Sequence, residues 1–157
     1  MAKNIQAHLK NETVAELEPP PGLRVAPATT VRETAELMQR HRTGCALVCE
    51  GDRLVGIFTE QDFLRRVVAK EKSQAIPVQE FMSRNPATIR PTDSIASVIA
   101  RFHAGRYRRL PVVGDQGELV GCLTVRSLVH HLAEHFPAAV FNVAPVSKPM
   151  QNDREGA

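Results

Sequence analysis

The segment Leu54-Val55-Gly56-Ile57-Phe58-Thr59 returns 65 positions later as Leu119-Val120-Gly121-Cys122-Leu123-Thr124. Upstream, the same correspondence holds at an offset of 64 and relates two sets of residues: Val14, Glu16, Val25, Pro27, Val31, Met38, Arg42 and Val48 correspond to Val78, Glu80, Ile89, Pro91, Ile95, Phe102, Arg106 and Val112. The offset changes between Asp52 and Leu54, at a predicted hairpin tip, where an extra residue disturbs no packed backbone. So long a period indicates two copies of one small fold packed against each other, with function expected at their shared cleft.

The composition narrows the class of protein. A length of 157 residues suits one ordinary domain or two very small domains that share a core, and the repeat favours the second. The chain is 43% hydrophobic and 24% charged. No apolar run approaches the roughly 20 residues that span a bilayer, so we expect a soluble protein without a membrane partner. The N-terminus lacks the apolar core of a signal peptide, which predicts a cytoplasmic location.

Three cysteines are too few, and odd in number, for a disulfide framework. Cys45 and Cys49 are four positions apart on one predicted strand, so their backbones lie about 13 Å apart and cannot be bridged. We interpret both as small buried hydrophobic residues.

The first copy, residues 14–70, follows an N-terminal arm over residues 1–13 that is either a short helix or a loose segment. Prolines 19–21 enforce an extended backbone between the arm and the first strand. The predicted elements are a strand over 25–27, a helix over 31–38 capped by Thr29 or Thr30, strands over 45–50 and 54–59, and a helix from Gln61.

A linker over residues 71–77 leads to the second copy, residues 78–136. Its predicted elements are a strand over 87–90, a helix from Ile95 capped by Thr92 or Asp93, strands over 110–113 and 119–124, and a helix over 126–135 that Pro137 ends. Residues 137–157 are expected to form an extended strap, from 138 to 150, and a disordered tail. The fold class is therefore α/β (α+β): two pseudo-symmetric repeats, each strand-helix-strand-strand-helix, packed sheet to sheet.

Four stretches carry a resemblance to a known family: residues 25–31 (VAPATTV), 56–62 (GIFTEQD), 86–91 (PATIRP), and 109–115 (RLPVVGD) followed by 119–124. In order and spacing each half resembles a CBS domain, and the tandem over residues 14–136 resembles a Bateman module. The resemblance implies binding rather than catalysis, with no catalytic residue, no metal and no required cofactor. Such modules commonly hold adenosine ligands, including AMP, ADP, ATP and S-adenosylmethionine, in two clefts between the repeats, and regulate a partner protein.

Thr59 and Asp62 match the Thr-x-x-Asp ribose clamp of that family. A carboxylate fixed at a helix start can accept hydrogen bonds from both ribose hydroxyls. The same spacing is also a helix capping box, and the two roles are geometrically compatible. The second copy has Thr124, Arg126 and Ser127 at the matching positions, so a hydroxyl replaces the carboxylate. We therefore expect two unequal sites, of which the Asp62 site binds adenosine better.

The remaining ligand residues follow from the resemblance, which assigns phosphate binding to the helix-to-strand junctions. The phosphate candidates are Arg42, Thr43, Arg106, Arg108 and Arg109; guanidinium groups grip phosphate oxygens in pairs. A solvated basic face is the alternative interpretation. The adenine candidates are Thr88, Ile89 and Pro91 at the Asp62 site, and Val25, Ala26 and Pro27 at the weaker site. A short buried strand would use the same residues.

Other interpretations of the sequence remain to be weighed. His131 and His135 lie in a His-x-x-Glu-His string, which zinc proteases of the inverzincin type use, but a solvated helix end explains it better. A single tyrosine and no tryptophan argue against nucleic acid as a partner.

Two classes of function follow. The first is a non-catalytic ligand sensor that signals to an unidentified effector protein. The second is a ligand-independent dimeric adaptor, and an S-adenosylmethionine sensor is a further variant of the first. The resemblance also implies a homodimer, for which we expect apolar contacts around four residues: Met38, Phe63, Phe102 and Leu128.

Overall fold

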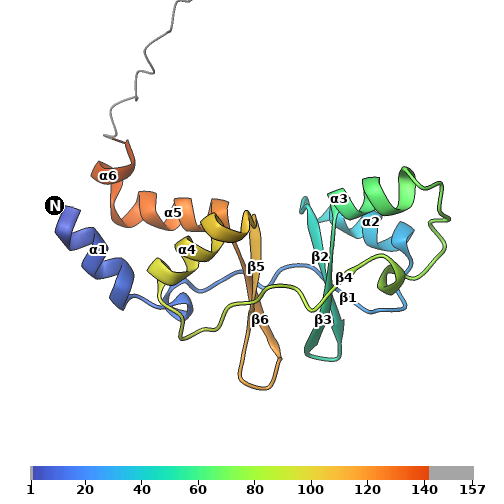
Figure 1. The fold of residues 1–157 in the computed structure, drawn as a ribbon, viewed down its shortest axis with the longest axis horizontal. Coiled ribbons are helices and arrows are strands. Elements are labelled where there is room, and N and C mark those ends of the chain that lie inside the picture. The colour runs from blue at the N-terminus through green and yellow to red at the C-terminus, as the bar shows by residue number, and fades with distance from the viewer. Residues whose placement is uncertain (1, 142–157) are drawn as a thin grey trace, which may run out of the picture.

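The computed structural model describes residues 2–141 and shows two similar halves side by side (Figure 1). In each half a β-hairpin stands at the centre of the molecule and helices lie on its outer side. Within the described residues no helix is both long and apolar enough to cross a bilayer. The two-repeat α+β fold predicted from the sequence is confirmed.

The first half contains a four-stranded sheet of order β1-β2-β3-β4, in which the edge strand β4 (Ser83–Arg84) comes from the second repeat. Its elements from the first repeat are β1 (Arg24–Val25), α2 (Val31–Arg40), β2 (Cys45–Glu50), β3 (Arg53–Thr59), α3 (Glu60–Asp62) and the π-helix η2 (Phe63–Val68) that continues α3. Strand β1 is parallel to β2, and β2 and β3 form the hairpin, with Cys45 opposite Thr59. Of the two candidate caps of α2, Thr30 is the one used, because its hydroxyl accepts from the Glu33 amide at 3.1 Å.

The second half contains a two-stranded sheet. Its elements are α4 (Ile95–Gly105), β5 (Arg109–Val113), β6 (Leu119–Thr124) and α5 (Val125–His135). The strand predicted over 87–90 is reduced to one bridge between Ile89 and Val112. Prolines 86 and 91 flank this segment and have no amide hydrogen to extend a ladder.

The predicted cap of α4 is wrong. Ser94, rather than Thr92 or Asp93, precedes the first helical residue and accepts from the Ser97 amide at 3.2 Å. The Asp93 carboxylate instead accepts from the Arg90 amide at 2.8 Å and closes the preceding turn.

Both chain ends are helical where the structure describes them. The N-terminal arm is helix α1 (Ala2–Asn11). The extended strap predicted from residue 138 is wrong over residues 138–141, because α6 (Pro137–Phe141) begins at Pro137. Proline suits the first position of a helix, where no amide donor is needed, so it starts this helix after ending α5. The remainder of the strap and the tail lie outside the described residues.

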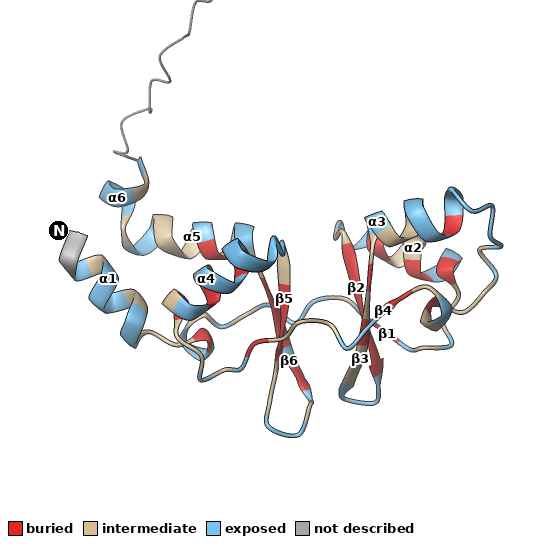
Figure 2. Ribbon diagram, in the orientation of Figure 1, coloured by how far each residue is buried: buried red, intermediate tan, exposed pale blue. Residues whose placement is uncertain are grey.

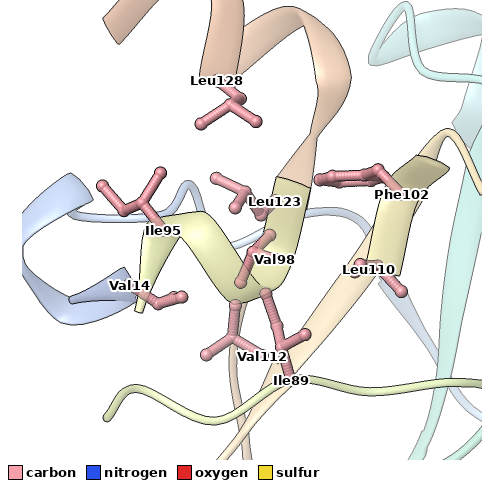
Figure 3. Packing of buried hydrophobic residues seen from close by; sticks show 9 residues of the cluster. All are labelled: Val14, Ile89, Ile95, Val98, Phe102, Leu110, Val112, Leu123 and Leu128. Carbon is pink, nitrogen blue, oxygen red and sulfur yellow. The ribbon is translucent and has the colours of Figure 1, made fainter. Parts of the chain in front are cut away.

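The two repeats exchange their first segments. The turn η1 (Val14–Leu17) starts the first repeat but packs on the second, where Val14 joins Ile95 and Val98 in the core (Figure 3). Conversely, η3 (Val78–Glu80) and β4 (Ser83–Arg84) follow the linker and pack on the first half, where Val78 is fully buried. Each half therefore depends on chain from the other copy.

Buried residues lie along both hairpins and on parts of the helices (Figure 2), and their side chains form three groups. Each half has its own core, and a third cluster of Leu47, Cys49, Leu119 and Cys122 lies between the two sheets. The hairpin tips also join, since the Leu119 amide donates to the Asp52 carbonyl at 2.8 Å. This direct contact fixes how the two halves meet.

Part of the predicted dimer face is wrong, because its residues are buried in the cores of the two halves. Met38, Phe102 and Leu128 are only 5%, 7% and 6% exposed, because they fill the cores of their own halves. Phe63 is partly buried against the first core. The large apolar side chains left exposed on nearby helices are instead Leu64, Val68, Val125 and Val129.

Candidate functional site

A pocket lies where the two repeats meet, at the end of the hairpins opposite their tips. This inter-repeat pocket has a volume of about 370 Å³. Its lining comes from both copies: Gly44, Ile57, Thr59, Glu60 and Gln61 from the first, and Ser83, Pro86, Ala87, Arg106, Tyr107, Arg108, Arg109 and Pro111 from the second. A second cavity of about 910 Å³, here called the α2 pocket, adjoins it and shares Gly44, Glu60 and Arg109 as lining.

The two helix-to-strand junctions have the same backbone conformation. Arg42 follows α2 and Arg106 follows α4, with φ values of 51° and 53° in the left-handed region. That region costs a residue with a side chain about 1–2 kcal/mol relative to right-handed backbone, and glycine would avoid the cost. Arginine therefore stands in both copies at a position where the backbone alone favours glycine.

The arginines predicted to bind phosphate are divided between the pockets. Arg106 and Arg108 line the inter-repeat pocket, Arg42 and Thr43 line the α2 pocket, and Arg109 lines both. Arg109 lies directly over the backbone of Gly44, because a Cβ added to that glycine would lie 2.5 Å from Nη2 of Arg109. The absence of a side chain at Gly44 thus allows an arginine of the second repeat to reach the first.

Asp62 completes a capping box with Thr59. Its Oδ2 accepts from the Thr59 amide at 2.9 Å and from the Thr59 hydroxyl at 3.0 Å, while the Thr59 hydroxyl accepts from the Asp62 amide at 3.3 Å. Its Oδ1 lies 3.5 Å from Nε of Arg66, and the side chain is 13% exposed. Thr59, Glu60 and Gln61 line the inter-repeat pocket, whereas Asp62 is not among its lining residues and follows them directly in the chain. The structure thus shows the capping role directly.

The matching residues of the second copy make a similar box without a carboxylate. The Thr124 amide donates to the Ser127 hydroxyl at 2.9 Å, and the Ser127 amide donates to the Thr124 hydroxyl at 2.9 Å. Arg126 between them is exposed. Serine and aspartate are therefore interchangeable as caps at this position of the fold.

The residues predicted for adenine at the Asp62 site are displaced from the pocket. Ile89 is 1% exposed within the second core, so its side chain cannot face a ligand. The carbonyls of Thr88 and Pro91 accept hydrogen bonds from Arg101 and from the Ala15 amide. Pro86 and Ala87, slightly earlier in the chain, line the pocket instead. The Asn85-Pro86 turn, which is visible in the sequence, could have indicated that Pro86 and Ala87 line the pocket.

The weaker site is not assembled as predicted. Val25 is buried in the first core, Ala26 is exposed, and Pro27 lines a separate cavity of about 300 Å³ together with Arg53 and Arg84. Gly44, Glu60, Gln61 and Tyr107 also line the pocket but were not predicted, because the contact between the two repeats brings them together and the repeat pattern does not specify that contact.

The histidines of the His-x-x-Glu-His string contribute to a contact between helices. Nε2 of His131 lies 2.9 Å from Glu12 Oε1, and Nε2 of His8 lies 3.0 Å from Glu12 Oε2. His131 is therefore not the solvated residue that we expected, since its side chain is only 12% exposed. His135 remains exposed, and its ring lies 4.2 Å from that of His131. These contacts hold α1 against α5.

Comparison with known proteins identifies the family. A family model described as CBS domain matches residues 14–69 and 78–134. The chain is 34% identical over 104 residues to the CBS domain-containing protein YhcV of Bacillus subtilis, covering 66% of this chain and 74% of that protein. It is also 34% identical over 110 residues to the CBS domain-containing protein CBSCBSPB1 of Arabidopsis thaliana, where the match covers 69% of this chain and 20% of the plant protein.

Among solved structures, the chain resembles the CBS domain protein PAE2072 from Pyrobaculum aerophilum complexed with AMP. The two share 27% sequence identity with a TM-score of 0.69, over 83% of this chain and 96% of that chain. The chain spans about a fifth of the length of the plant relative and nearly all of this solved structure. With both copies matched, the chain belongs to the CBS domain family and carries a pair of these domains.

Proposed function

We propose that the chain is a non-catalytic regulatory module that binds an adenosine nucleotide in the inter-repeat pocket and signals to an effector protein. The observation that supports it most is the convergence of Arg106, Arg108 and Arg109 with Thr59 on one pocket. A volume of about 370 Å³ lies within the range of small-molecule sites. Among the described residues none of these three arginines takes part in an ion pair, so their donors are free for phosphate.

Each part of a nucleotide has a partner of suitable chemistry in the inter-repeat pocket or, for the ribose, at Asp62 next to the lining residue Gln61. Ile57, Pro86, Ala87 and Pro111 supply apolar surface for the base. The Asp62 carboxylate uses Oδ2 in the cap, whereas Oδ1 makes only the longer contact to Arg66 and keeps lone pairs for a ribose hydroxyl. The arginines bind the phosphates. The adjoining α2 pocket leaves room beyond Arg109 for the additional phosphates of ADP or ATP.

The comparison supports a nucleotide over other anions, because the related protein PAE2072 was solved with AMP and shares the fold over almost its whole length. S-adenosylmethionine is the alternative adenosine ligand. Glu60 on the pocket wall offers a carboxylate for its ammonium group. The phosphate ligand is favoured because three arginines surround the same space.

Substituting Asp62 by serine tests the ribose assignment without removing the cap. Ser127 shows that a serine completes the same box, so Asp62→Ser removes the carboxylate and keeps the helix start. We expect isothermal titration calorimetry to show AMP binding weakened about tenfold, the loss of one charge-assisted hydrogen bond, with little change in melting temperature.

The exposed Asp115 provides the matched control, since it lies in the β5–β6 turn and its side chain is 92% exposed. Asp115→Ser should bind AMP like the unmodified chain. Equal AMP affinity of the unmodified chain and Asp62→Ser would refute the ribose clamp. A chain that bound no adenosine ligand at millimolar concentration would instead favour the ligand-independent adaptor.

A further inference from the structure

Two cysteines from different repeats face each other between the sheets. Alternate residues of β2 point to opposite sides, so Ala46 and Val48 enter the first core while Cys45 and Leu47 face the second repeat. Cys122 of β6 lies opposite them in the cluster that contains Leu47. Both cysteines are free and are only 4% and 5% exposed. Cys45 lies two residues from Leu47 on the same face of β2, so its thiol faces the repeat that carries Cys122.

The surroundings favour a thiolate on one member of this pair. The neighbouring Cys122 thiol, the charge of Arg109 and the hydroxyl of Thr43 together lower the pKa of Cys45, although burial opposes them. The pKa of Cys122 is raised, because it keeps the proton that the pair shares and is itself buried. The third cysteine, Cys49, has a pKa raised by burial and is the less reactive thiol.

We propose that Cys45 and Cys122 form a redox-active pair, which a hydroperoxide such as hydrogen peroxide converts into a disulfide joining the two repeats. The Cys45 thiolate attacks one peroxide oxygen, the O–O bond breaks, and hydroxide leaves, giving a sulfenic acid. The Cys122 sulfur then attacks the sulfenic sulfur, the S–O bond breaks, and the leaving hydroxide takes up the Cys122 proton. Two thiols and one peroxide thus give one disulfide and two waters.

The pair is placed so that oxidation acts on the ligand pocket. Gly44, the residue before Cys45, lines both pockets and is covered by the guanidinium of Arg109, so Cys45 lies one residue from the pocket wall. The bond would join β2 of one repeat to β6 of the other, next to the pocket that both repeats line. It would therefore fix the separation of the two walls of the pocket.

Intact-mass measurement on the full chain tests the proposal without any nucleotide. After treatment with a small excess of hydrogen peroxide and alkylation of the remaining thiols, we expect the unmodified chain and Cys49→Ser to hold an intramolecular disulfide. Peptide mapping should place it between Cys45 and Cys122, and dithiothreitol should reverse it. Cys45→Ser and Cys122→Ser should form none under the same conditions.

Three results would overturn the proposal. The first is that all three thiols of the folded unmodified chain can still be alkylated after peroxide treatment. The second is a mapped disulfide that includes Cys49, and the third is that disulfides form only between chains. Because the mapping is done on the unmodified chain, the test does not depend on the folding of the serine variants, which circular dichroism would check. The formation of this disulfide is also independent of AMP binding, so the two proposals can fail separately.

Discussion

At the scale of single residues, Gly44 is the position where the smallest change should have a functional effect. Its backbone φ is not in the left-handed region, so alanine is conformationally acceptable there. The added methyl group would displace the guanidinium of Arg109 and little else, since the three nearest atoms all belong to that side chain. Gly44→Ala should therefore weaken AMP binding roughly three- to tenfold while leaving the melting temperature unchanged.

A double-mutant cycle decides whether the effect passes through Arg109. In an Arg109→Ala background, Gly44→Ala should cause no further loss of AMP affinity in calorimetry, because the group that it displaces is already absent. Additive losses would show instead that the methyl group blocks the pocket itself.

Single residues also show how far the sequence could predict the site. The match of Thr59 and Asp62 located a helix start beside the inter-repeat pocket, and the arginine run located the lining from the second repeat. The prediction that Ile89 contacts adenine was wrong. A short apolar segment between prolines has the same sequence whether its side chains face a ligand or the core. The burial of Cys45 and Cys122 on facing sides of the two hairpins had no local signal, since it depends on how the hairpins pack.

At the scale of elements, the helix starts were predicted to within one or two residues. The capping residues show why the sequence could not locate these starts more accurately. Thr29 and Thr30 are both suitable capping residues, as are Thr92, Asp93 and Ser94. Which of them is used depends on where the helical backbone begins, and the neighbouring half helps to set this. The Val31 amide donates to the Ile76 carbonyl, and the Ile95 amide donates to the Glu12 carbonyl.

The cap of α2 gives a matched pair of substitutions. Thr30→Ala removes the hydroxyl that accepts from the Glu33 amide, and it should lower the free energy of unfolding by about 1 kcal/mol. Thr29→Ala changes the neighbouring residue, which has no part in the cap. In urea denaturation we expect the midpoint of Thr30→Ala to fall and that of Thr29→Ala to stay nearly constant; equal midpoints would argue against the cap.

At the scale of the whole molecule, the repeat predicted two similar halves packed through their sheets but not the exchange of their first segments. Val14 and Val78 occupy matching positions in the two copies, and each is buried in the opposite half. Sequence periodicity reports which residues are equivalent, not which half each one joins. The exchange makes the halves mutually dependent, so we expect them to unfold together.

The exposed apolar residues of the outer helices predict the surface through which two copies of the chain would associate. Leu64 and Val68 on η2 are 58% and 49% exposed, and Val125 and Val129 on α5 are 40% and 50% exposed. Each pair is four residues apart and so lies on one helix face. If the chain forms a dimer through these faces, Leu64→Glu or Val129→Glu should convert it to a monomer in multi-angle light scattering at micromolar concentration.

Val120 provides the control for this test, because it is 44% exposed on β6, away from the two helices. Val120→Glu should leave the dimer intact. An unmodified chain that is already a monomer at that concentration would rule out the dimer, and equal disruption by all three substitutions would rule out the helical faces.

Arg109 connects the nucleotide pocket with the thiol pair. The neighbouring Cys122 thiol and then the charge of Arg109 lower the pKa of Cys45, and Arg109 also lines the pocket. A bound phosphate would neutralise the field of this guanidinium, which would raise the pKa of Cys45 and reduce its thiolate fraction near neutral pH. Saturating AMP should therefore slow the alkylation of Cys45 by iodoacetamide at pH 7, measured by mass spectrometry in Cys49→Ser. Above the usual thiol pKa of about 8.5 the effect should fade, since the thiolate then predominates with or without ligand.

Adenosine and an Arg109→Gln variant separate this electrostatic effect from simple blockage of the route to the sulfur. Adenosine occupies the base and ribose positions without a phosphate, so it should protect Cys45 less than AMP does at equal occupancy. Arg109→Gln removes the charge, so its Cys45 should react slowly at pH 7 and respond little to AMP. Equal protection by adenosine and AMP, at every pH, would mean that the ligand covers the thiol and that Arg109 does not couple the two sites.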